Sequence, residues 1–297
     1  MTSLVPDERL IEEKARQLLR QAGVRGFPTP VDDIVDAAGL VQPKESLLSE
    51  SVIAEAPSHI RRAIRKLTGR VRAILDRKAH EVHVDPGIHN LGRIAFHKLH
   101  EVVHEIIPWQ QKLAYADDDG TLSPAAHELS EREANIGASH LLFQFEYFED
   151  LVRDYRIGMA AILDIAQTVG ASAHATFRRY VRVHDGAVAG LVMDLSPCSR
   201  EPLAYRRHEV VCSESWAKEF GATWPGVLRA KPFDFVNSAE EARTSATGAV
   251  RTYWAFPNLR NESVELHVDV YCNQYRIFVL IWKPRREALR RRTLLVA

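Results

Sequence analysis

His100, Glu101 and His104 are the residues best placed to do chemistry, because residues 100–104 read His-Glu-Val-Val-His, an HExxH motif. Residues 93–107 contain neither glycine nor proline, and Pro108 disfavours helical geometry at the residue before it. We therefore expect the motif to lie inside one helix that ends near residue 107. Side chains four residues apart leave one face of a helix about 5–6 Å apart at Cβ, so both imidazoles can bind the same ion.

This motif predicts zinc-dependent hydrolysis. A catalytic zinc is held by three protein ligands, and the fourth position is left for water. Zinc lowers the pKa of that water to about 7, and Glu101 is placed to accept its proton and pass it to the leaving amine. The alternative interpretation is an ordinary amphipathic helix whose histidines are buried and hydrogen-bonded.

A third ligand is expected in residues 127–143. Ser130 followed by Glu133 matches a capping box, and the apolar residues that follow have helical spacing, so a second helix is predicted to begin near residue 130. Glu131 and Glu133 both lie in its first turn, and both are candidates. The metzincin arrangement needs a glycine and a third histidine soon after the motif, where this chain has Ile107 and Gln110.

The HExxH motif, the Glu-x-Glu-Ala-Asn stretch at 131–135 and the Leu-Leu at 141–142 together resemble the ImmA/IrrE family of metallo-endopeptidases. Residues 30–40 and 82–86 resemble its amino-terminal helix and the strand before its active helix. The resemblance covers residues 1–180 approximately. It implies a zincin-like peptidase with zinc on His100, His104 and Glu133, Glu131 as the reserve candidate, and Glu101 as catalytic acid/base. It also implies a substrate class, helix-turn-helix transcriptional repressors cleaved in a stress or mobile-element response.

The chain departs from the family pattern near the motif. The family usually carries glycine before the second histidine, where this chain has Val103. It carries a Phe-Ala pair where this chain has Gly137 and Ala138, and Met-Pro where this chain has Phe143 and Gln144. These changes reshape the packing of the helices and remove no ligand.

Composition indicates an intracellular globular protein. Thirty-nine basic and 39 acidic residues cancel, so the overall charge favours neither nucleic acid nor a membrane. Cys198, Cys212 and Cys272 have no CxxC spacing, and we expect reduced thiols that bind no metal. The pattern of residues 7–19 is typical of an amphipathic helix rather than of a signal peptide, and no apolar run reaches the ~18 residues of a membrane span. We therefore expect a cytoplasmic protein.

An α+β fold in three parts is expected to position these residues. Residues 1–150 form the zinc metallopeptidase-like part, in which strands 71–76 and 81–85 make an antiparallel pair that could hold an extended substrate. Residues 151–185 form a helix-turn-helix-like helical segment, on the Ala-x-x-x-Gly spacing of 166–170. Residues 186–297 form a carboxy-terminal α+β domain with a sensor or dimerisation role. The remaining expected elements are helices 8–22, 30–39, 214–220 and 238–246 and strands 188–195, 209–212, 264–272 and 276–282, the last two joined by a turn at 273–274.

Several roles stay open at this stage. Arg178 and Arg179 are the side chains that a DNA-reading helix would use, although packing or partner contact is the preferred role of the segment, and the basic stretch 283–292 adds no firmer evidence. The candidates for oxyanion donor are His97, Tyr115, His127 and His140. Zinc is the expected metal, and manganese can use the same ligands. The alternative to a protein-cleaving enzyme is a non-proteolytic metal-containing regulatory protein that acts through DNA or protein binding, and the intact Glu101 favours the enzyme.

Overall fold

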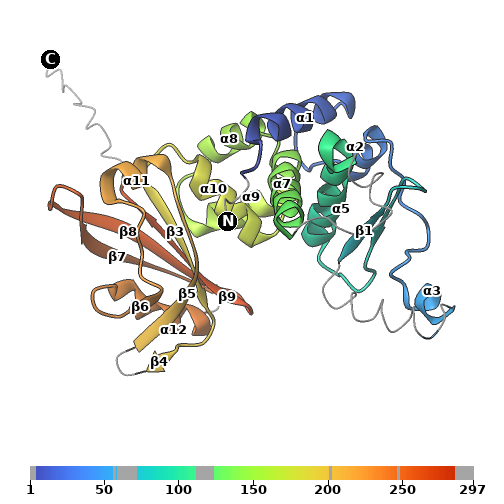
Figure 1. Ribbon diagram of the computed structural model, residues 1–297. Coiled ribbons are helices and arrows are strands. Elements are labelled where there is room, and N and C mark those ends of the chain that lie inside the picture. The colour runs from blue at the N-terminus through green and yellow to red at the C-terminus, as the bar shows by residue number, and fades with distance from the viewer. Residues whose placement is uncertain are drawn as a thin grey trace, which may run out of the picture. The chain divides into compact units, whose positions relative to one another are not determined.

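The computed structural model describes residues 5–55, 58, 72–111, 124–200, 203–245 and 248–284. The chain forms two compact units, which are described separately below (Figure 1). Met1–Leu151 and Asp164–Ala173 make unit 1, and Val152–Leu163 and His174–Ala297 make unit 2. Helices and strands are mixed, as the expected α+β class requires. The segment expected at 151–185 is shared between the two units.

Unit 1 contains a small sheet and a group of helices. Its elements are α1 (Glu8–Gln21), α2 (Val31–Ala37), α3 (Glu50–Glu55), β1 (Ala73–Asp76), β2 (Glu81–Val84), α5 (Leu91–Ile106) and α7 (Pro124–Phe143). Two more helices, α8 (Glu146–Arg153) and α9 (Met159–Val169), each have residues in both units. Strands β1 and β2 pair antiparallel from Ala73↔Val84 to Asp76↔Glu81, so the expected hairpin across residues 77–80 is confirmed.

Helix α5 carries the HExxH motif through the middle of unit 1. It lies between the β1–β2 sheet and α7 (Figure 1), and it packs against both of them and against α2. Asn90 caps its start by accepting a hydrogen bond from the backbone N–H of Arg93 at 3.0 Å. It ends at Ile106, and Ile107 is extended because Pro108 follows. Both the placement of the motif inside one helix and the end of that helix are as predicted.

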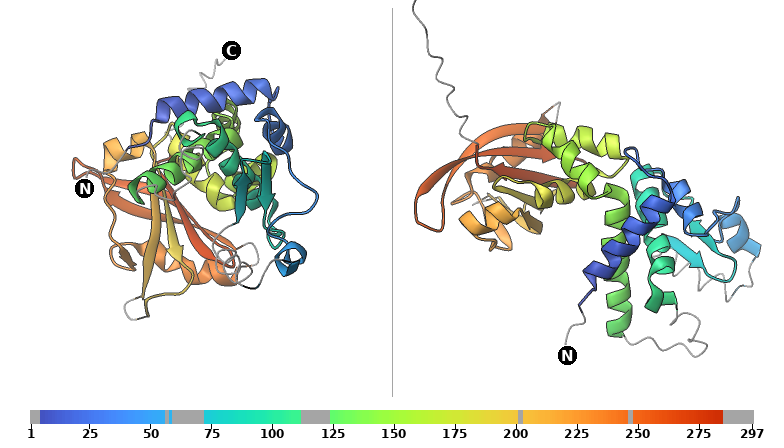
Figure 2. Two further views of the ribbon diagram at one scale, coloured as in Figure 1. Left: turned by 45° about the vertical axis from the view of Figure 1, so that its right-hand side comes forward. Right: turned by 90° about the horizontal axis from the view of Figure 1, so that it is seen from above.

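Helix α7 begins earlier than the sequence pattern predicts. It starts at Pro124, a residue favoured in the first turn of a helix, so Ser130 and Glu133 lie inside it and form no capping box. Tyr115, one of the candidates for oxyanion donor, lies outside the described residues. The view from above in Figure 2 shows α1 crossing α7, and the two helices pack against each other.

The unusual residues near the motif fit each other at the crossing of α5 and α7. Val103 is fully buried, and a Cβ placed on Gly137 would lie 2.7 Å from both of its γ-carbons. At this crossing the bulk is on α5 and the gap is on α7, so the two residues are complementary in size.

Unit 2 is built on an antiparallel sheet in the order β4-β5-β3-β9-β8-β7, and β6 also pairs with β5. Its strands are β3 (Val188–Asp194), β4 (Ser199–Arg200), β5 (Leu203–Cys212), β6 (Val227–Arg229), β7 (Ala249–Pro257), β8 (Ser263–Cys272) and β9 (Arg276–Trp282), and its helices are α10 (Ala173–Val183), α11 (Glu214–Phe220), the 3-10 turn η1 (Asp234–Val236) and α12 (Ser238–Thr244). The predicted hairpin at 273–274 and both predicted helices are confirmed. Strands β4, β6 and β7 are additional.

The sheet of unit 2 is covered on both faces. Alternate residues of β3 and β9, such as Leu191 and Val279, join an aromatic core with Trp216 and Phe235. The opposite face packs against α10, where the Phe177 and Phe278 rings lie 5.3 Å apart. Side chains of alternate residues in a strand point to opposite faces, which explains why the whole central part of the sheet is buried.

Helix α10 is the second helix of the predicted helix-turn-helix. Helix α9 ends at Val169, Gly170 has φ +76°, and α10 begins at Ala173, so the turn that the spacing indicates is present. Phe177, Tyr180 and Val181 are fully buried. Arg178, a candidate for DNA contact, instead forms an ion pair with Glu209 on β5, with Nε 2.7 Å from Oε1.

Among the described helices, none combines the length and the apolar character needed to cross a membrane. Of the basic stretch 283–292, only Lys283 and Pro284 lie in the described part of the chain.

Candidate metal centre

Three side chains from two helices converge on one point in unit 1. His100 and His104 come from adjacent turns of α5, and Glu131 comes from α7. His100 Nε2 lies 3.1 Å from His104 Nε2 and 3.4 Å from Glu131 Oε2. His104 Nε2 lies 3.5 Å from Glu131 Oε1. Within the described residues this is the one group of three or more metal-type ligands.

These spacings fit a divalent metal ion. A tetrahedral zinc ion with ligands at 2.0–2.1 Å has donor atoms ~3.3 Å apart, close to the three separations found here. Two imidazoles and a carboxylate are also the donor set of a catalytic zinc site. Two histidine nitrogens that face each other with a carboxylate beside them are stabilised by a cation between them.

Glu133 is placed away from this point. Its side chain is buried, and its Oε2 accepts hydrogen bonds from Trp109 Nε1 at 2.8 Å and Gln110 Nε2 at 2.9 Å. Residues two apart on a helix are separated by about 200°, so Glu131 and Glu133 face opposite sides of α7. The prediction of Glu133 as the third ligand is therefore replaced by Glu131, which the sequence held in reserve.

The three side chains line an open cleft of about 620 Å³. The other wall is formed by Arg72 and by residues 73–75 of β1, and the outer edge of β1 pairs with no strand in the described residues. Glu101 lines the same cleft. Arg77, at the turn after β1, donates from Nη2 to the backbone carbonyl of His104 at 3.1 Å and so ties the strand to α5.

The carboxylates and histidines of the site shift each other's pKa values. Burial raises the pKa of Glu101, although the two histidines oppose the shift. Hydrogen bonds from His100 and His104 hold the pKa of Glu131 far below its usual range. Burial alone would lower the pKa of His104, but the hydrogen bond with Glu131 and the charge of Glu101 raise it. Glu131 therefore offers a carboxylate to a cation over a wide pH range.

Of the other candidates, His97 and His127 line the cleft. Burial and the charge of Arg93 lower the pKa of His97 to about 4, so its ring is neutral near pH 7 and can donate a hydrogen bond. His140 stacks on Phe145, with ring centroids 4.6 Å apart, and is not among the lining residues of the cleft. Asn135 Nδ2 donates to the carbonyl oxygen of Glu131 at 2.8 Å and supports the backbone of that residue.

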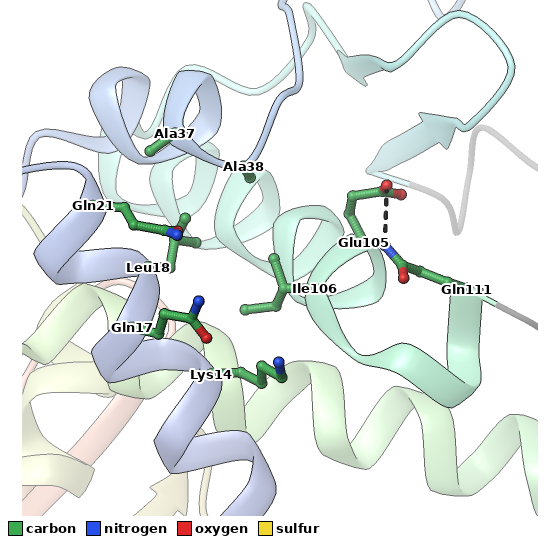
Figure 3. Close-up of a pocket in the computed structure, with 9 residues that line it drawn as sticks. All are labelled: Lys14, Gln17, Leu18, Gln21, Ala37, Ala38, Glu105, Ile106 and Gln111. Atoms are coloured by element: carbon green, nitrogen blue, oxygen red, sulfur yellow. Dashed lines mark hydrogen bonds between the residues drawn. The ribbon is translucent and has the colours of Figure 1, made fainter.

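A second pocket of about 220 Å³ lies at the end of α5, between α1 and α2 (Figure 3). Lys14, Gln17 and Gln21 line it from α1, and Glu105 and Gln111 from the α5 side. Gln111 Nε2 donates to Glu105 Oε1 at 3.3 Å.

Two residues of the site were not found from the sequence. Trp109 and Gln110 follow Pro108, and Gln110 Oε1 lies 2.7 Å from His104 Nδ1. Nothing in their sequence spacing indicates this contact.

Compared with known proteins, the chain matches no protein-family profile and no curated protein. A solved structure described as a Mycobacterium tuberculosis transcriptional regulator is similar, with a TM-score of 0.54 and 10% sequence identity. The similarity covers 94% of this chain and 82% of that one, and at this identity it shows the fold alone.

Proposed function

We propose that this chain is a metal-dependent endopeptidase with a zincin-like active centre that cuts a specific protein substrate. The observation that carries the proposal is the convergence of His100, His104 and Glu131 at spacings that fit zinc, beside Glu101 in one cleft. His100, His104 and Glu131 would hold the ion, which supplies Lewis acidity and lowers the pKa of bound water. Manganese suits the same ligands.

Glu101 is the proposed acid/base. It follows the first histidine ligand, lines the cleft and is largely withdrawn from water, so it can take a proton from the attacking water and return it to the leaving amine. The edge of β1 offers backbone groups to an extended peptide along the same cleft. A peptide laid there would occupy the cleft that His100, His104 and Glu131 also line.

The proposed substrate is a helix-turn-helix transcriptional repressor, and the proposed setting is a cytoplasmic stress or mobile-element response. This part rests on the resemblance of the motif region to the ImmA/IrrE family. The chain's fold is also shared with a protein described as a transcriptional regulator, which is in keeping with a role in transcription.

That same likeness favours the second candidate, a metal-containing regulatory protein without proteolysis. The ion pair of Arg178 with Glu209 makes protein contact a better proposal for it than DNA contact through α10.

Metal analysis and a cleavage assay test the proposal together. Purified protein should retain one zinc-class ion, and His104→Ala or Glu131→Ala should remove it, because two remaining ligands hold the ion poorly. Cleavage of a quenched-fluorescent peptide library and of denatured casein should require Glu101. Full retention of metal by both ligand variants would overturn the metal site. A protein that binds metal but cuts neither probe nor a genomically adjacent repressor would favour the regulatory candidate.

A further inference from the structure

A chain of hydrogen bonds runs from the metal centre to a buried carboxylate. His104 Nδ1 lies 2.7 Å from Gln110 Oε1, and Gln110 Nε2 lies 2.9 Å from Glu133 Oε2. Gln110 and Glu133 are 4% and 3% exposed, so water does not compete for these bonds. Ser130 Oγ lies 3.4 Å from the same histidine nitrogen.

The carboxylate of Glu133 determines which group donates in each of these hydrogen bonds. An ionised carboxylate only accepts hydrogen bonds, so the amide nitrogen of Gln110 must face Glu133. The amide oxygen of Gln110 then faces His104, and because that oxygen only accepts, His104 must donate from Nδ1. In the neutral ring this leaves the lone pair on Nε2, the atom that faces His100 and Glu131.

Glu133 is itself held in place from two other sides. Trp109 Nε1, which can only donate, lies 2.8 Å from Oε2. The backbone N–H of Asp7, at the start of α1, lies 3.4 Å from Oε1. The carboxylate therefore keeps its position and its accepting role even when Gln110 is changed.

We infer that Gln110 and Glu133 are positioning residues, which hold His104 in the tautomer and ring orientation that bind a metal through Nε2. The inference rests on the proposed metal site for its purpose, but the tautomer itself is a property of the metal-free protein. Partners of this kind on the second nitrogen of a metal-binding histidine typically change metal affinity about 10- to 100-fold when removed.

The test measures the tautomer and the metal affinity separately. Two-bond ¹H–¹⁵N spectra of metal-free protein labelled in its histidine rings report which nitrogen of His104 carries the proton, at alkaline pH where the ring is neutral. Wild type should show only the Nδ1–H form. Gln110→Met, which keeps the length of the side chain and removes the acceptor, should show a mixture and should bind zinc about 10- to 100-fold more weakly.

Gln111→Met is the matched control. Its amide contacts Glu105 on the wall of the second pocket (Figure 3) and takes no part in the chain of bonds. This variant should keep the wild-type tautomer and zinc affinity. The indole N–H resonance of Trp109 should stay in place in Gln110→Met, which shows that the fold and Glu133 are retained.

An Nε2–H tautomer in the wild type would overturn the inference without any variant. So would Gln110→Met with a pure Nδ1–H tautomer and unchanged zinc affinity. A wild type that binds no zinc but shows the expected tautomer would refute the proposed function and leave the positioning chain standing.

Discussion

The contact between Val103 and Gly137 makes a sharp prediction about how α5 and α7 are held together. In Gly137→Ala the new Cβ would lie 2.7 Å from both γ-carbons of Val103, whereas ordinary carbon contacts are about 3.5–4.0 Å. Overpacking of this kind costs about 1–3 kcal/mol, and the better helix propensity of alanine returns about 0.5–1 kcal/mol. We expect Gly137→Ala to destabilise unit 1 by up to about 2.5 kcal/mol.

The effect should be much smaller when Val103 is Ala. The two methyl groups that meet the new Cβ are then absent, and the next nearest atom, Ile11 Cγ2, is 3.3 Å away, a tight contact that a shift of a few tenths of an ångström relaxes. The better helix propensity of alanine, about 0.5–1 kcal/mol, offsets the cost of that shift, so Gly137→Ala should destabilise this background less than the wild type. The comparison of single and double variants isolates the coupling between the two residues.

Hydrogen–deuterium exchange of peptides from α5 and α7 is the suitable assay, because it reports on unit 1 without mixing in the unfolding of unit 2. Val102→Ala is the control background. Val102 is as fully buried as Val103, but none of its atoms is among the three nearest to a Cβ placed on Gly137. If Gly137→Ala has the same effect in the wild-type, Val103→Ala and Val102→Ala backgrounds, the proposed packing of the crossing is refuted.

Three further results are expected. Glu101→Gln should keep the metal, measured by elemental analysis, and should lower peptide cleavage by at least about 10²-fold, because the amide cannot accept a proton; unchanged cleavage would exclude Glu101 as the base. Gly190→Ala should lower the melting temperature of unit 2, because its Cβ would lie 2.6 Å from the Phe177 ring and overpacking costs about 1–3 kcal/mol; equal melting curves would contradict this. Burial opposes ionisation of Glu209, but His174 and Arg178 hold its pKa below the usual 4.5. Its charge therefore stabilises the fold above pH 4.5, and this stabilisation is lost as the pH falls through the lowered pKa. The melting-temperature gap between wild type and Glu209→Gln should therefore shrink in acid, and a gap independent of pH would refute the linkage.

The parts of the fold that follow from local sequence were predictable. Pro108 fixes the end of α5, and the apolar residues of β8 and the continuous apolar run of β9, separated by a polar turn, indicate their hairpin. Strand β7 was missed although it is rich in apolar residues, because only Trp254 is buried and its other side chains are half-buried or exposed, so the burial pattern is weak. Its place in the sheet depends on pairing with β8, which is far less visible in a single sequence.

The candidate site shows the same division. His100, Glu101 and His104 are brought together by the period of one helix, which a sequence displays directly. The choice between Glu131 and Glu133 depends on the orientation of α7 about its axis, and two identical side chains in one turn give no local signal for that. The apparent capping box at Ser130 also led to a late start for the helix, because a cap pattern inside a helix looks the same as one at its end.

The division of the chain between its two units limits how it can be cut or exchanged. The path passes from one unit to the other three times, at residues 151, 163 and 173. Residues 164–173 belong to unit 1, and their final turn lies against the start of α5 so closely that a Cβ on Gly92 would be 2.8 Å from the backbone of Ala171 and Ser172. A fragment that stops at residue 150 therefore lacks the support under the HExxH helix. Recombination at a single point before residue 173 cannot pass on the whole of unit 1, and residues 152–163 of unit 2 are inherited with its last segment.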